Sequence, residues 1–416
     1  MAQNKTQGML SPYRVLDLAD EKGLLCGKLL GDMGADVIKI ERPGGDPARD
    51  IGPFYHDTPH PERSLFWFAF NTNKRSITLD IETIDGQELF KRLVKTTDFV
   101  IESFPPGYME KLGLGYSTLE KLHTGVIMVS ITPFGQTGPY RHYKAPDIVA
   151  WAMGGIMYST GDPDRPPVQI GHHSQAYLHA GAQASIGAML ALCHRAKTGE
   201  GQLVDVCIQE SAVRIDACGA SFWDVLKVQW QRGERPAPTL QLPWTWQCKD
   251  GYVIFVYFGG PLGVRMNSPL VKWMDDEGMA DDFMRKLDWG ALNPNSQSWE
   301  MLDGIIARTN KFFMSHTAAE LYEGALRQNV MLYPVATVKD MLDSVQLAAR
   351  GYWVELEYPE LGTKIIHPGA FAYVSELPPE IRRRAPLIGE HNREVYEEEL
   401  KLSREELIRL KEAGVI

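Results

Sequence analysis

Two adjacent histidines, His172 and His173, are the side chains whose type most directly suggests proton transfer. Imidazole titrates near neutral pH, so one of them could carry a proton to or from a substrate. The alternative is a pair of loop histidines without a chemical role. Asp147 and the turn at residues 136–139 are also polar. We interpret both as structural, with Asp147 capping the helix that follows it.

The cysteine pattern gives no support to metal or disulfide chemistry. The chain has five cysteines, and no two of them have the spacing Cys-x-x-Cys. An odd number without that spacing fits neither a zinc site nor a disulfide framework. The five are Cys26, Cys193, Cys207, Cys218 and Cys248. Because most of them have apolar neighbours, we expect buried, reduced thiols and no bound metal.

The turn after the first predicted strand argues against a dinucleotide site. Residues 19–23 read Ala-Asp-Glu-Lys-Gly, so the glycines of the pattern Gly-x-Gly-x-x-Gly are missing. Those glycines let the backbone approach a pyrophosphate. Glu41 ends the second predicted strand, where a ribose-binding acid could lie. Without the glycines, we interpret it as an ordinary charge at a strand end.

The elements that must position these groups belong to a chain of 416 residues with a net charge of −10. This length exceeds one compact core and predicts two or three domains. The negative charge excludes a basic nucleic-acid-binding surface, although a few local cations can still hold phosphates. No run reaches 18 apolar residues, and the first ten residues have no apolar signal core. We therefore expect a cytoplasmic protein without a membrane partner.

Strands that alternate with short helices predict an α/β fold with a parallel sheet covered on both faces. The predicted strands are residues 14–18, 36–41, 76–80, 99–102, 125–131 and 203–208. The predicted helices between them are residues 22–33, 83–94 and 178–195. The last of these is rich in alanine and glycine, so we expect it to be buried in the middle of the fold.

The character of the sequence changes after about residue 221. Trp223, Trp230, Trp244, Trp246, Trp273, Trp289 and Trp299 follow, among shorter apolar runs. We predict residues 1–221 as the N-terminal part of a large domain, 222–333 as a small domain and 334–416 as the part that returns to the large domain. We interpret the tryptophans as core, with an aromatic acyl pocket as the alternative. Ser403 and Glu406 form a capping box for a final helix at 403–412.

Eight short motifs follow one another along the chain. They are residues 15–18 (VLDL), 34–43 (GADVIKIERP), 71–80 (NTNKRSITLD), 100–107 (VIESFPPG) with 112–114 (LGL), 134–140 (FGQTGPY), 147–155 (DIVAWAMGG), 195–205 and 385–392 (APLIGEHN). In this order they resemble the class III CoA-transferase family, of the formyl-CoA transferase and carnitine dehydratase type. The resemblance extends over residues 13–416.

The resemblance implies a Rossmann-like large domain built from both chain ends, a small domain, and two interlocked chains. It implies coenzyme A thioesters as substrates and no covalently bound cofactor. In active relatives an Asp carboxylate attacks the donor thioester and forms a mixed anhydride. The freed CoA thiolate and the acceptor acid then exchange through that carboxylate. Backbone donors stabilise the transient oxyanion.

The chain departs from the family at the nucleophile. In relatives the Asp precedes a Gly by four residues and a Thr-Gly-Glu-Gly turn by about 21. Counted from Gly181 and Thr198, that position is Tyr177. A phenol forms no mixed anhydride and, with a reference pKa of about 10, is mostly un-ionised near neutral pH. No Asp or Glu lies between Asp164 and Glu200, so a shift of register does not supply one.

A second departure lies in the first loop, where active relatives carry an Ala-Gly-Pro turn that contacts CoA. Residues 20–25 (DEKGLL) replace that turn and are one residue shorter. Two acids there would repel the CoA phosphates. Other positions that contact CoA in relatives persist as Arg42, Asn71, Phe104, Lys111 and Lys144. The alternative for each is a solvated or capping residue.

The leading hypothesis is a supporting subunit that lacks the nucleophile. Its partner would be a paralogous chain that keeps the Asp, in an interlocked heterodimer or heterotetramer. The resemblance implies CoA exchange between succinyl-CoA and a carboxylic acid such as (R)-benzylsuccinate, a step of anaerobic toluene degradation. One alternative is an acyl-CoA isomerase or racemase with a His base, which would place solvent deuterium at the α-carbon. The other is a non-catalytic homodimer that binds CoA esters.

Overall fold

The computed structural model describes residues 8–171, 174–229, 231–233, 239–293 and 296–416. It divides the chain into two compact units, one comprising residues 1–229 and 348–416 and the other residues 230–347. The sequence places the corresponding transitions at 221/222 and 333/334. The predicted α/β fold class is confirmed by the parallel sheet of the first unit.

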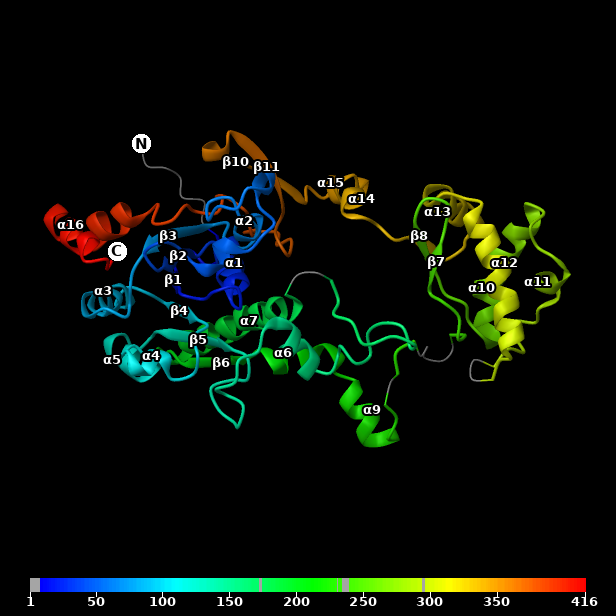
Figure 1. The fold of residues 1–416 in the computed structure, drawn as a ribbon, viewed down its shortest axis with the longest axis horizontal. Coiled ribbons are helices and arrows are strands. Elements are labelled where there is room, and N and C mark those ends of the chain that lie inside the picture. The colour runs from blue at the N-terminus through cyan, green and yellow to red at the C-terminus, as the bar shows by residue number, and fades with distance from the viewer. Residues whose placement is uncertain (1–7, 172–173, 230, 234–238, 294–295) are drawn as a thin grey trace. The chain divides into compact units, whose positions relative to one another are not determined.

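The first unit is built on a six-stranded parallel sheet with the order β3-β2-β1-β4-β5-β6 (Figure 1). Its strands are β1 (Arg14–Asp17), β2 (Asp36–Glu41), β3 (Lys74–Thr78), β4 (Phe99–Glu102), β5 (Ile127–Thr132) and β6 (Leu203–Cys207). The strand order reverses at the pair formed by β1 and β4. From β1 the chain adds β2 and β3 on one side, and it then returns to add β4, β5 and β6 on the other side. In open α/β sheets, ligands bind in the crevice at such a reversal, outside the carboxyl ends of the strands.

Alternate residues of these strands point to opposite faces, and helices cover both faces. Val15 and Ile101 belong to the core on one face, which includes α1 (Leu24–Asp32) and α7 (Gln175–Thr198). Leu16 and Val100 belong to the core on the other face. Helices that contribute to that second core include α3 (Ile84–Val94), α5 (Tyr116–Leu122) and α16 (Arg404–Glu412).

Shorter elements connect this framework. The remaining helices of the first unit are α2 (Leu65–Phe70), α4 (Tyr108–Lys111), α6 (Asp147–Met153), α8 (Ile208–Val213) and α9 (Gly219–Leu226). Short 3-10 turns cover Pro47–Asp50, Tyr55–Asp57, Arg214–Asp216 and Pro359–Leu361, and a π-helical turn covers Glu394–Glu399. In the part of the chain that the structure describes, no helix is both long enough and apolar enough to cross a bilayer.

The C-terminal part adds to the first unit. It begins with the antiparallel hairpin of β10 (Trp353–Tyr358) and β11 (Thr363–Pro368). Further on, the His391 N–H donates to the Ser76 carbonyl at 2.9 Å, and the Thr78 N–H donates to Asn392 Oδ1 at 2.9 Å. These bonds cover the edge strand β3. The predicted capping box of Ser403 and Glu406 is confirmed at the start of α16.

The second unit has its own core around a three-stranded antiparallel sheet with the order β7-β8-β9. Its elements are β7 (Thr245–Gln247), β8 (Tyr252–Phe255), α10 (Gly260–Asp276), α11 (Asp282–Lys286), α12 (Trp299–Met314), α13 (Ala318–Gln328), β9 (Leu332–Pro334) and α14 (Val338–Leu342); α15 (Val345–Ala349) lies at the boundary with the first unit. Trp246, Trp273 and Trp289 belong to the core of this unit. Trp299 of this unit is instead exposed, as is Trp223, which belongs to α9 of the first unit.

The expectation that this alanine- and glycine-rich helix, α7, lies buried in the middle of the fold is confirmed for one of its faces only. Its small residues, among them Ala180 and Ala184, pack against the sheet as expected. Its opposite face exposes Ile186 by 60% and Leu190 by 67%. Apolar composition predicts burial, but it does not say whether the same chain or another one supplies the cover.

Candidate active-site pocket

A pocket lies where the turn after β1, helix α2 and the first turn of α7 meet. Most of its walls are apolar, and its polar groups are one carboxyl and two hydroxyls. The residues that line it are Glu21, Leu24, Leu25, Phe66, Phe70, Ser174, Tyr177 and Leu178. The position at which the family resemblance expects an Asp is therefore part of a pocket wall.

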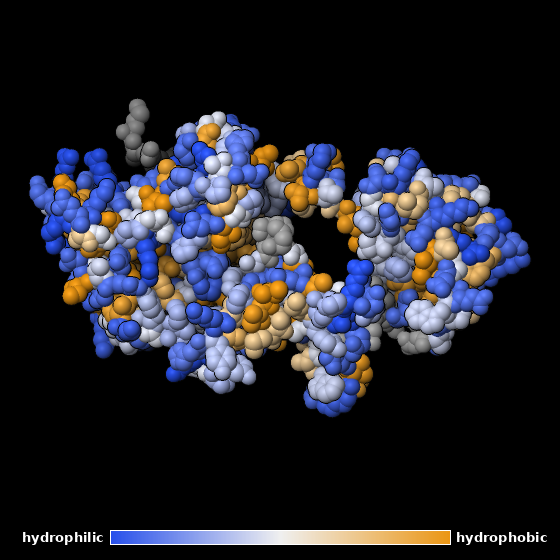
Figure 2. Space-filling model, viewed as in Figure 1, coloured by the Kyte–Doolittle hydropathy of each residue, from blue (hydrophilic) through white to orange (hydrophobic). Residues whose placement is uncertain are grey.

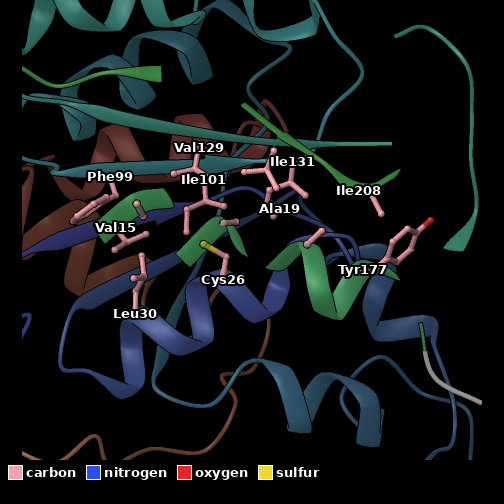
Figure 3. Close-up of a cluster of buried hydrophobic side chains, with 14 of the residues drawn as sticks. Val15, Ala19, Cys26, Leu30, Phe99, Ile101, Val129, Ile131, Tyr177 and Ile208 are labelled. Atoms are coloured by element: carbon pink, nitrogen blue, oxygen red, sulfur yellow. The ribbon is translucent and has the colours of Figure 1, made fainter. Parts of the chain in front are cut away.

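Tyr177 is held at both its main chain and its side chain. Its N–H donates to Asp147 Oδ1 at 3.0 Å, and its hydroxyl donates to the Ala145 carbonyl at 3.1 Å. The residue is only 6% exposed, and Figure 3 shows its hydroxyl directed away from the apolar cluster that its ring joins. Burial raises the pKa of the phenol above its ordinary value, and the negative charges of Glu21 and Asp147 raise it further. The phenol is therefore un-ionised and serves as a hydrogen-bond donor.

Asp147 caps a different helix from the one expected. It is the first residue of α6, and the N-cap position of α6 is Pro146, which has no side-chain cap bond. Its carboxylate instead accepts a hydrogen bond in the first turn of α7, from the Tyr177 N–H. The Gln169 side chain also donates to it, at 2.7 Å. Burial raises the pKa of Asp147 in spite of these bonds. The prediction failed because the acceptor and the N–H lie 30 residues apart in the chain.

Replacing Tyr177 by Phe should lower the free energy of unfolding by about 1 kcal/mol. The substitution keeps the ring but leaves the Ala145 carbonyl, which belongs to a buried residue, without its donor. Urea unfolding of the two proteins measures the difference. Tyr143→Phe is the matched control, because Tyr143 is 60% exposed and its change should stay within about 0.5 kcal/mol. Equal losses in the two variants would contradict the assignment of a structural bond to Tyr177.

Two buried lysines fix the turn that carries Glu21. Lys39 Nζ donates to the Ala19 carbonyl at 2.6 Å, and Lys74 Nζ donates to the Leu24 carbonyl at 2.9 Å. Both ammonium groups are 0% exposed. The two ammonium groups therefore fix the first and last residues of the segment 19–24, which follows the carboxyl end of β1.

The two acids of that turn have different environments. Asp20 forms an ion pair with Lys22, and its Oδ1 accepts from the Ser103 hydroxyl at 2.7 Å. Its charge is thus compensated, so a repulsion of phosphates from this turn would come mainly from Glu21. Burial raises the pKa of the Glu21 carboxyl, and the neighbouring Asp20 charge raises it further. No sequence pattern identifies Glu21 as a pocket residue, because its partner surfaces come from α2 and α7.

Three of the predicted CoA-contacting residues lie around one surface group, Glu82. Arg42 Nη2 lies 2.7 Å from Glu82 Oε1, and the Tyr108 hydroxyl donates to the same oxygen at 2.7 Å. The ring of Phe104 stacks on that of Tyr108 with 4.6 Å between centroids. The hydrogen bond from Tyr108 and the charges of Arg42 and Lys111 lower the pKa of Glu82. Tyr108 and Glu82, which join this group, are not among the residues predicted from the sequence.

The other predicted residues do not join this group. Asn71 is 0% exposed, and its Oδ1 accepts from Lys74 Nζ at 2.9 Å, so it acts inside the fold. Lys144 is exposed beside Ala145, the acceptor of the Tyr177 hydroxyl. His172 and His173 lie outside the described residues. Within the described ranges, no group of three or more His, Cys, Asp or Glu side chains is arranged to hold a metal ion.

Comparisons with known proteins agree along almost the whole chain. The family model described as CoA-transferase family III matches residues 10–392. The succinyl-CoA:(R)-benzylsuccinate CoA-transferase subunit BbsE of Thauera aromatica is 35% identical over 394 residues, which cover 93% of each chain. The succinyl-CoA–D-citramalate CoA-transferase of Chloroflexus aurantiacus is 32% identical over 418 residues, which cover 100% of each. The crystal structure of a CaiB/BaiF family protein from Brucella suis matches with a TM-score of 0.82 and 30% identity, over 94% of this chain and 100% of that one.

Proposed function

We propose a function on the premise that this chain belongs to CoA-transferase family III. It is a subunit of an enzyme that moves CoA between succinyl-CoA and a carboxylic acid such as (R)-benzylsuccinate. The chain itself lacks the nucleophilic carboxylate and supports a paralogous chain that carries one. The two chains form an interlocked heterodimer or heterotetramer.

The state of Tyr177 is the observation that carries this proposal. The first turn of α7 contains no acidic residue, and the phenol at position 177 is buried and hydrogen-bonded to Ala145. A carboxylate can attack a thioester carbonyl, expel CoA as the thiolate and become an acyl anhydride. An un-ionised phenol in a wall of the pocket cannot take that role. We therefore assign the covalent step to the carboxylate of the paralogous partner.

Exposed apolar side chains on neighbouring helices support assembly with a second chain. Helices α6, α7 and α8 contact one another in the first unit, and α9 follows α8 along the chain. Figure 2 shows apolar side chains gathered over the region of α6. The exposed residues on these helices include Ile148, Val149, Met153, Ile186, Leu190, Val213, Trp223, Val225 and Leu226. Apolar patches of this kind mark protein–protein contacts.

The names of the relatives support the choice of substrates. Both curated relatives are named as enzymes, or subunits of enzymes, that use succinyl-CoA. One of them is named as a subunit, which agrees with a chain that works beside a partner. Because the two acceptors named are (R)-benzylsuccinate and D-citramalate, we propose (R)-benzylsuccinate from the higher identity of its relative.

The purified chain alone should show no CoA transfer from succinyl-CoA to (R)-benzylsuccinate. Co-expression with the paralogous chain should give turnover in the range of ordinary enzymes, about 1 to 1,000 per second. Formation of benzylsuccinyl-CoA, followed by chromatography and mass spectrometry, is the measurement. Turnover by the lone chain at such a rate would overturn the supporting role.

A matched pair of variants locates the chemistry within the complex. Tyr177→Phe in this chain should leave turnover of the complex within about threefold, because the phenol takes no part in the covalent step. Replacing the proposed partner carboxylate by its amide should lower turnover at least a thousandfold, as loss of a nucleophile does. A thousandfold loss from Tyr177→Phe would place the chemistry on this chain instead.

A further inference from the structure

Glu102 is a buried carboxyl at the carboxyl end of β4, beside the reversal of strand order. It is 3% exposed. Its Oε2 accepts from the Phe104 N–H at 2.7 Å, and its Oε1 accepts from the Ser130 hydroxyl. Nothing in the proposed transfer chemistry uses this carboxyl, so its burial calls for another explanation.

The bond to the Phe104 main chain connects Glu102 to the surface group around Glu82. The Phe104 ring stacks on Tyr108, whose hydroxyl donates to Glu82 at 2.7 Å. Arg42 pairs with the same Glu82 oxygen. The position of the Phe104 backbone therefore sets one side of an aromatic and cationic surface, and Glu102 is the side chain that fixes that backbone from inside.

The environment of Glu102 lets both of its protonation states occur near neutral pH. Burial raises its pKa to about 7, although the hydrogen bonds from Ser130 and Phe104 lower it. The Glu110 carboxylate on α4 raises this pKa further, and the Lys22 ammonium lowers it. Asp20, which accepts from the hydroxyl of the adjacent Ser103, is itself paired with Lys22.

We propose that Glu102 is a positioning residue, whose ionised carboxylate fixes the Phe104 backbone and so sets the surface that meets the CoA ester. The naming of the CoA ester as ligand rests on the proposed function, whereas the control of the loop does not. An ionised acceptor forms a stronger hydrogen bond with an N–H than a neutral carboxyl does. The loop at residues 103–107 therefore tightens as the pH rises through neutrality and loosens as it falls.

Amide hydrogen exchange tests the control of the loop without any ligand. Residues 105 and 106 are prolines without an N–H, so few amides contribute to the signal of residues 103–107. Between pH 6 and pH 8, the protection factor of the Phe104 amide should rise roughly five- to tenfold, after correction for intrinsic exchange. In Glu102→Gln the factor should stay constant, because an amide does not titrate in this range.

The matched control is Glu110→Gln, which makes the same change in an exposed acid of α4 that also acts on Glu102. It should keep the rise in protection and move its midpoint to lower pH. Ser130→Ala should move the midpoint to higher pH, and it serves as the test if Glu102→Gln does not fold. A flat profile in the unchanged protein, or a rise that persists in Glu102→Gln, would overturn the proposal.

Calorimetry with CoA tests the ligand separately. CoA should bind the unchanged complex severalfold more tightly at pH 8 than at pH 6, relative to the ratio for Glu102→Gln. The comparison with Glu102→Gln removes the titration of the CoA phosphates themselves. Equal ratios in the two proteins would overturn the link between the loop and the ligand. Absence of CoA binding at both pH values would overturn the proposed function, while the exchange result would still decide the role of Glu102.

Discussion

Lys74→Met should lower the free energy of unfolding by about 3 to 5 kcal/mol, the range for removing one member of a buried ion pair. The Lys74 ammonium is 0% exposed and uses all three of its protons. It donates to Asp17 Oδ2 at 2.8 Å, to Asn71 Oδ1 at 2.9 Å and to the Leu24 carbonyl at 2.9 Å. Methionine fills similar space but leaves these acceptors buried and without their donor.

The loss should shrink when the charge left behind is also removed. Asp17 is 0% exposed, and its other oxygen accepts from the Ala19 N–H at 3.0 Å. The double variant Asp17→Asn with Lys74→Met should therefore be more stable than Lys74→Met alone, because no uncompensated carboxylate remains. Urea unfolding followed by circular dichroism and tryptophan fluorescence measures all three proteins.

Lys91→Met is the matched control for Lys74→Met. Lys91 pairs with Glu88 at 2.8 Å on the surface of α3, where both side chains meet water. Exposed pairs contribute little, so this variant should lose less than about 0.5 kcal/mol. Similar losses for the two lysines would show that the three bonds of Lys74 do not stabilise the fold.

Asp147→Ala should lower the free energy of unfolding by about 2 kcal/mol, because the Tyr177 N–H in the first turn of α7 loses its acceptor. Helix α7 has 24 residues, and Ser174 at its N-cap position makes no side-chain cap bond. The carboxylate of Asp147, from the neighbouring α6, takes its place. The substitution also frees the amide of Gln169.

Two further variants calibrate the effect of Asp147→Ala. Asp147→Asn keeps one acceptor oxygen and should lose less than the alanine variant. Thr83→Ala removes an ordinary local cap, the bond from the Gly86 N–H to the Thr83 hydroxyl, and should cost about 1 kcal/mol. Thermal and urea unfolding give the three values. If Asp147→Ala cost less than Thr83→Ala, the capping across two helices would not be a main support of α7.

Local sequence patterns predicted the elements whose structure depends on near neighbours. The strands at residues 36–41 and 99–102 have the predicted bounds, because short runs rich in valine and isoleucine, ended by polar residues, define them. The third strand was predicted at residues 76–80 and lies at Lys74–Thr78. Lys74 is buried there by its pairing with Asp17 and Asn71, a partnership that hydrophobicity along the chain does not show.

The candidate site was predictable only in part. Counting from Gly181 and Thr198 shows that Tyr177 occupies the position of the family Asp. The structure places this tyrosine in a pocket wall. The sequence also suggests Arg42, Phe104 and Lys111 as CoA contacts. It does not show that they share Glu82 and Tyr108 as neighbours, because these residues meet only in the folded chain. The identity of the α7 cap failed for the same reason, since Asp147 belongs to another helix.

The sequence alone determined the family, the α/β class and the absence of an acid at the expected position of α7. Each of these depends on residue types and on their spacing along the chain. The tertiary structure decided which charges are compensated, which side chains share a pocket and which apolar faces stay uncovered. Those properties depend on contacts between residues far apart in sequence: Asp20 accepts a hydrogen bond from Ser103, whereas Glu21 and Tyr177 line the same largely apolar pocket.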